Sequence, residues 1–98
     1  MPDNHLSQAL QLANKDFNLE IPAGEIVTTE DFQRVLAKVV QQLLNHDFGS
    51  LVNGLYRIDV SEEKVKLAMA SGEDVADKIA GLIIEREMQK VVTRQKYK

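Results

Sequence analysis

Cysteine is absent from this 98-residue sequence, and aromatic residues make up only 5% of it. Without cysteine there is no disulfide framework, no thiolate nucleophile and no cysteine-ligated metal centre, which excludes whole classes of enzyme and metalloprotein. Because aromatic side chains are few, the core must consist mainly of Leu, Val, Ile and Ala, which interdigitate well between helices.

Long hydrophobic segments are absent as well. Apolar runs such as GLII at residues 81–84 are far shorter than the ~20 residues that a membrane-spanning helix needs. The N-terminal stretch MPDNHLSQ also lacks the basic and apolar regions of an export signal. We therefore expect a cytoplasmic protein with no membrane partner.

What is present is the composition of a soluble globular domain, with 44% hydrophobic and 28% charged residues. A chain of this length has material for one hydrophobic core, so we expect a single domain over residues 1–98. Within it the sequence separates an N-terminal helix and arm (1–28), a helical bundle (29–93) and a basic tail (94–98).

Charge is distributed unevenly along the chain, although the net charge is only −3. Residues 1–31 hold six acids and one lysine, a balance of −5, whereas residues 79–98 hold five bases and two acids, a balance of +3. A basic tail with Lys90, Arg94, Lys96 and Lys98 is compatible with nonspecific nucleic-acid binding. The acidic remainder of the chain would repel phosphate, so a solvated helix end is the favoured interpretation.

The hydrophobic periodicity predicts an all-α fold with four main helices, at about residues 29–46, 48–58, 61–70 and 73–93. A shorter N-terminal helix is expected at residues 4–14. Between them, residues 17–27 alternate polar and apolar side chains around a proline and a glycine, which fits either an extended arm or a small hairpin. Start signals for the four main helices are the capping residues Thr28, Asp47, Ser61 and Ser71.

The tripeptide Asp47-Phe48-Gly49 matches the magnesium-binding turn of protein kinases, but the chain has none of the other kinase motifs and is too short for two kinase lobes. We interpret Asp47 as a helix cap, and the two glycines of the following helix, Gly49 and Gly54, as places where a neighbouring helix approaches closely.

Other chemistry is equally poorly supported. His46 lacks a second metal ligand at a suitable spacing, and Ser50 has neither a positioned base nor the aspartate that precedes the modified serine of acyl carrier proteins. A helix-turn-helix formed by the last two helices would begin its recognition helix with Glu73, Asp74 and Asp77, which would repel DNA. We expect no enzymatic activity, no metal and no cofactor.

The last helix has two apolar faces. Ile79, Leu82 and Ile83 fall on one side of a helical projection, and Ile84, Met88, Val91 and Val92 fall on nearly the opposite side. One small bundle has little left to cover the second face, so these four residues are the expected interface with a second copy or a helical partner. The alternative is that the N-terminal helix or the 17–27 arm folds back over them.

The segments LLNHDFGSLVNGLYRIDVSEEKVK and IAGLIIEREMQKV resemble a group of small, uncharacterised bacterial proteins that are all-helical. The resemblance covers about the last two-thirds of the chain and implies a helical fold, but it brings no function and no site residues.

The sequence thus favours a protein–protein interaction module that self-associates as a homodimer through its C-terminal helix. The alternatives are nonspecific nucleic-acid binding by the basic tail and binding of a small ligand near His46, Asp47 and Tyr56.

Overall fold

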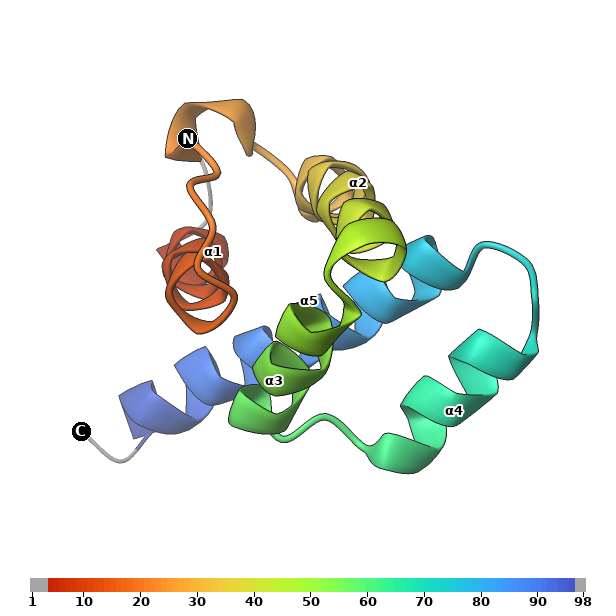
Figure 1. Cartoon of the computed structure of the whole chain (residues 1–98). Helices are drawn as coiled ribbons and strands as arrows, with labels where there is room; N and C mark the ends of the chain where they lie inside the picture. The colour runs from red at the N-terminus through yellow and green to blue at the C-terminus, as the bar shows by residue number, and fades with distance from the viewer. Residues whose placement is uncertain (1–3, 97–98) are drawn as a thin grey trace.

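The computed structural model describes the backbone of residues 4–96 and the side chains of residues 5–94, and this part of the chain contains helices and no strand. Five α-helices and one 3₁₀ turn follow one another (Figure 1): α1 (Asn4–Asp16), η1 (Ala23–Glu25), α2 (Thr29–His46), α3 (Phe48–Ile58), α4 (Glu62–Ala70) and α5 (Val75–Lys96). The segment between α1 and α2 therefore contains a 3₁₀ turn and no hairpin.

Local capping contacts explain where three of the helices begin. Thr28 forms a capping box with Asp31 at the start of α2, in which each side chain accepts a hydrogen bond from the other residue's backbone N–H. Asp47 accepts from the backbone N–H of Ser50 at the start of α3, and Ser61 accepts from that of Lys64 at the start of α4. Each contact satisfies a backbone donor that the first helical turn leaves unpaired.

Ser71, expected from the sequence to be the N-cap of the last helix, is instead the C-cap of α4, and α5 begins at Val75. Its hydroxyl donates to the carbonyl oxygen of Ala68 at 2.7 Å, which ties the side chain to the last turn of α4. Gly72 and Asp74 both adopt positive φ angles, which turn the chain before α5 starts. At its other end α5 continues to Lys96, so residues 94–96 are helical and do not form a separate tail.

Helix α5 is the centre of the molecule, because α1, α2, α3 and α4 all pack against it (Figure 1). Its contacts with α2 and α1 are the most extensive. Side chains of α2 and α5 that are fully or almost fully buried form the middle of the core: Phe32, Leu36, Val40, Ile79, Ala80 and Ile83.

The N-terminal helix is held in place by contacts of residues 17–28, the arm that follows it. The side-chain amide of Asn14 donates to the carbonyl oxygen of Ile21 and accepts from the Ile21 backbone N–H, both at 3.1 Å. Phe17 is buried, and its ring lies directly over Gly54 of α3, where even a methyl group would collide with it. These contacts close α1 and the arm over α5 and α3.

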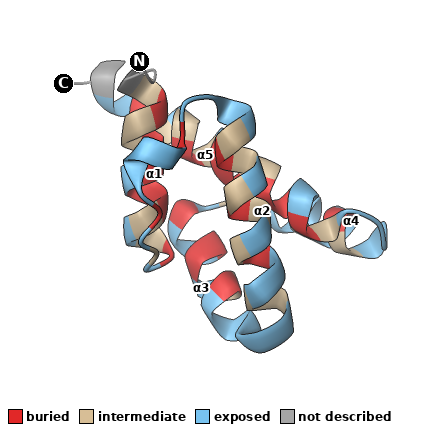
Figure 2. Ribbon diagram, turned by 90° about the horizontal axis from the view of Figure 1, so that it is seen from above, coloured by how far each residue is buried: buried red, intermediate tan, exposed pale blue. Residues whose placement is uncertain are grey.

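Helix α4 is the least embedded helix. Ala68 is its one buried residue, and Leu67 is 68% exposed. In Figure 2 most of this helix is coloured as exposed or intermediate. It packs against α5 but barely touches α3, although only residues 59–61 separate the two helices in sequence.

Candidate functional site

The second apolar face of the C-terminal helix lies largely inside the chain itself. Ile84 is 5% exposed, Val91 is fully buried and Met88 is half-buried, whereas Val92 remains 49% exposed. Ile84 and Val91 are therefore not available as interface residues on this structure, contrary to the assignment made from the sequence.

The cover over that face is α1, which the sequence had allowed as the alternative. Ile84, Glu87 and Val91 follow one another at the three- and four-residue spacing of a single helical stripe. Glu87 lies beside Asp16 of α1, so the stripe faces that helix. Helix α1 contributes apolar side chains of its own, five of which are buried: Leu6, Ala9, Leu10, Leu12 and Ala13.

The apolar surface that does remain open is a groove between α3 and α4, with a volume of about 440 Å³. Each helix contributes one stripe with helical spacing. The α3 stripe consists of Phe48, Val52, Leu55, Tyr56 and Asp59; the α4 stripe consists of Glu62, Val65, Lys66 and Met69. We call this surface the α3–α4 groove.

Both apolar and charged side chains line the α3–α4 groove. Tyr56 is 72% exposed and Phe48 is 48% exposed, so both rings present apolar surface on the same side of α3 as the groove. Asp59, Glu62 and Lys66 are its charged lining residues, and none of the three forms an ion pair with a residue that the structure describes.

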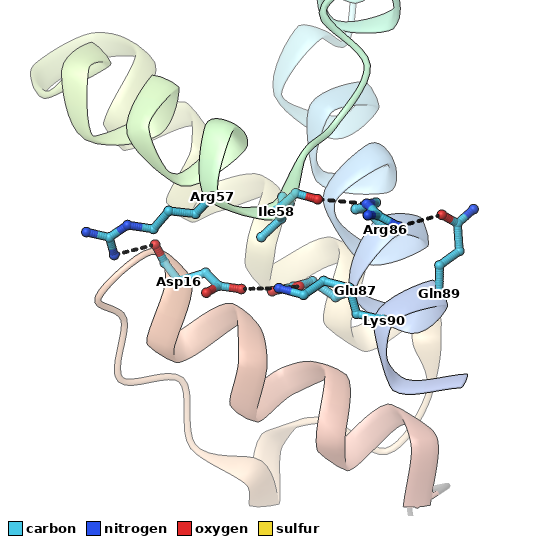
Figure 3. Close-up of polar contacts among 7 residues, drawn as sticks. All are labelled: Asp16, Arg57, Ile58, Arg86, Glu87, Gln89 and Lys90. Carbon is cyan, nitrogen blue, oxygen red and sulfur yellow. Dashed lines mark hydrogen bonds and ion pairs between the residues drawn. The ribbon is translucent and has the colours of Figure 1, made fainter. Parts of the chain in front are cut away.

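A second notable arrangement is the polar cluster between α1 and α5 (Figure 3). The Nζ atom of Lys90 lies 3.1 Å from Oδ2 of Asp16 and 3.4 Å from Oε1 of Glu87. Glu87 is 0% exposed, and neither of its carboxyl oxygens makes a hydrogen bond with the described residues. Burial of a charge without full pairing is costly, so this carboxyl group favours its protonated form.

The pKa of Glu87 reflects this environment. Burial raises it, the adjacent Asp16 carboxyl group raises it further, and Lys90 lowers it, with a net result of about 7. An acid with a pKa in this range changes its charge near neutral pH, which an ordinary surface glutamate does not.

Two arginines tie the same region to α3. Arg57 donates from Nη1 to the backbone carbonyl oxygen of Asp16 at 3.3 Å. Arg86 donates from Nε to the carbonyl oxygen of Ile58 at 2.7 Å, and its Nη1 reaches Oε1 of Gln89 (Figure 3). These bonds satisfy carbonyl groups at the ends of α1 and α3, which is a structural role.

Residues considered for chemistry from the sequence alone lie in unremarkable places. The Asp47 carboxylate accepts from the Ser50 hydroxyl at 2.6 Å and from its backbone N–H, and both bonds lower the pKa of Asp47. His46 is the exposed last residue of α2. Neither His46 nor Asp47 lines the groove that contains Tyr56, so the three residues do not form one ligand site.

Over the described residues, His, Asp and Glu side chains form no group of three or more that could hold a metal ion. The same part of the chain has no helix with both the length and the apolar character to cross a bilayer. Comparison of the chain with protein-family models, with curated proteins and with solved structures gives no match.

Proposed function

We propose that the protein is a protein–protein interaction module that self-associates through the α3–α4 groove, with α4 of a second copy packed into it. The observation that carries the proposal is the pair of apolar stripes on α3 and α4, which face the same open groove and barely contact each other. If two such helix pairs close on one another, four stripes share one core, as in a four-helix bundle.

The charge pattern of α4 fits a second copy of the same chain. Glu62 and Lys66 belong to the groove-lining stripe and lie four residues apart. When two α4 helices pack antiparallel about a two-fold axis, Glu62 of each copy faces Lys66 of the other. The surface is thus complementary to itself, which a two-fold interface requires.

Sedimentation equilibrium over a wide range of protein concentrations tests the proposal, and the expected result is a reversible dimer. Val65→Glu places a charge inside the groove and should make the protein monomeric, because the partner would bury that charge unpaired. The matched control is Leu67→Glu on the same helix, since Leu67 is 68% exposed and does not line the groove. The control should leave the association unchanged.

A charge swap tests whether the two α4 helices pack antiparallel. Glu62→Lys should weaken the dimer, and adding Lys66→Glu should restore it, because the reversed pair is again complementary. A protein that stays monomeric at every concentration would overturn self-association, as would a dimer that Leu67→Glu disrupts and Val65→Glu does not.

Nucleic-acid binding by the basic C-terminal end has less support. Lys90, one of the four bases assigned to it, is held by Asp16 and Glu87. Arg94 is exposed, while the side chain of Lys96 and the whole of Lys98 lie outside the described residues.

A further inference from the structure

We propose that Asp16, Glu87 and Lys90 form a proton-dependent latch that holds α1 against α5. In its protonated state the latch is closed. Loss of one proton weakens the hold on α1 and favours exposure of the apolar stripe that contains Ile84 and Val91. This inference concerns a different surface from the α3–α4 groove and does not depend on self-association.

The geometry of the cluster makes its charge balance decisive. Two carboxyl groups face one ammonium group, with Lys90 Nζ at 3.1 Å from Asp16 and at 3.4 Å from Glu87. With one proton on the carboxyl pair the cluster is neutral, and without it the cluster carries one excess negative charge. Because Glu87 is 0% exposed, water cannot solvate that charge while α1 stays in place.

The surroundings supply no other cation for the Glu87 carboxylate. On α5, Arg86 is turned to the carbonyl oxygen of Ile58 and to Gln89. On α3, Arg57 is bound to the backbone oxygen of Asp16. Lys15 of α1 is exposed, and His5 is eleven residues from Asp16, at the opposite end of α1.

Helices α2 and α4 also pack on α5, but their charges do not reach the cluster. Among the described residues, the ion pair of Glu87 is with Lys90, and the charges that shift its pKa are those of Asp16 and Lys90. The groups on those two helices are Glu30, Asp31, Arg34, Lys38 and His46 on α2, and Glu62, Glu63, Lys64 and Lys66 on α4.

The direction of the pH effect follows from linkage. The pKa of Glu87 is about 7 with α1 docked, above its ordinary value of 4.5, so the docked state binds the proton more tightly than the open state. The stabilisation of the docked state is therefore complete below pH 4.5 and is lost progressively as the pH rises to about 7.

Hydrogen exchange of the α1 backbone amides at about pH 5 and about pH 8, expressed as protection factors, measures this directly. We expect protection of α1 to fall by roughly tenfold to a hundredfold between the two conditions, since each pKa unit corresponds to a factor of ten in the equilibrium constant. Amides in the middle of α2 should lose less protection than those of α1.

Glu87→Gln keeps the shape of the side chain and cannot ionise, so α1 protection in this variant should not depend on pH in this way. Glu85→Gln on the same helix is the matched control, because the side chain of Glu85 is 56% exposed and its contact with Lys64 spans 4.0 Å. This control should keep the wild-type pH dependence.

Equal loss of protection in α1 and α2 would overturn the latch, because it would indicate global unfolding. The same conclusion would follow if Glu87→Gln kept the wild-type dependence. Denaturant unfolding of each variant at about pH 5 verifies that it is folded where the exchange is compared.

Discussion

The α1–α5 contact and the α3–α4 groove are built from similar amphipathic helices, yet one is sealed and the other is open. In the first, Val91 and Ala13 are fully buried and even a glutamate, Glu87, is excluded from water. In the second, Tyr56 and Phe48 remain largely exposed. Sequence pattern alone therefore does not determine which apolar stripe is covered.

The connections between the helices account for the difference. Residues 17–28 link α1 to α2 and are long enough for α1 to return across the C-terminal half of α5. Residues 59–61 form a tight link between α3 and α4, in which Asp59 adopts the left-handed conformation (φ 59°). The Val60 backbone N–H bonds to the Leu55 carbonyl oxygen, as in a Schellman motif, and the chain then turns α4 away from α3.

Replacing one valine by alanine at the α1–α5 contact and another in the α3–α4 groove gives the largest expected contrast. Val91→Ala removes two methyl groups from a fully buried site and should lower the free energy of unfolding by about 2 kcal/mol. Val65→Ala in the groove should cost less than about 1 kcal/mol in the monomer, because its side chain is only half-buried.

Denaturant unfolding at a low protein concentration measures both values. Repeating it at a high concentration should enlarge the effect of Val65→Ala, since dimer formation adds to stability by mass action. Equal losses at the two sites under dilute conditions would show that the two regions are packed alike.

Two glycines of α3 give a second contrast, of opposite sign. Gly54→Ala should destabilise the protein by about 1 to 3 kcal/mol, because its methyl group would displace the Phe17 ring that links the arm to α3. Gly49→Ala meets no close neighbour and should stabilise the protein by up to about 1 kcal/mol through helix propensity. Thermal unfolding should therefore move in opposite directions; a gain for Gly54→Ala would contradict the close contact with Phe17.

Local sequence signals predicted part of the fold well. The all-helical class and the bounds of the helices at 29–46 and 48–58 were predicted as the structure has them, because caps and hydrophobic periods are local properties. A close approach was predicted at Gly49 and Gly54. It exists at Gly54, where the neighbour is the ring of Phe17 and not another helix, but nothing approaches Gly49 closely.

The relative placement of the helices was not predicted correctly. Whether α1 or another molecule covers Ile84 and Val91 depends on where the long connection between α1 and α2 places α1, which no local pattern encodes. One signal was overlooked: Glu87 lies on the same stripe as Ile84 and Val91, and a charged residue inside an apolar stripe indicates a buried, paired position. The α3–α4 groove was not predicted, because it depends on how α4 is turned away from α3, which is also a matter of helix placement.

The smallest expected contrast concerns two helix caps, one on the core helix α2 and one on α4 at the groove. Thr28→Ala removes the capping box of α2, the helix most extensively packed on α5, and should lower global stability by about 1 kcal/mol. Ser61→Ala removes the equivalent cap of α4, but α4 contributes only Ala68 to the core. Its loss should therefore fray α4 while leaving the global unfolding transition almost unchanged.

Amide exchange distinguishes the two outcomes, because fraying raises exchange in α4 alone, whereas a global loss raises it in the slowest amides of α2 and α5. If Ser61→Ala lowers the protection of those slow amides as much as Thr28→Ala does, α4 belongs to the cooperative core. The α3–α4 groove would then be a rigid part of the monomer, and dimer formation would not need to order α4.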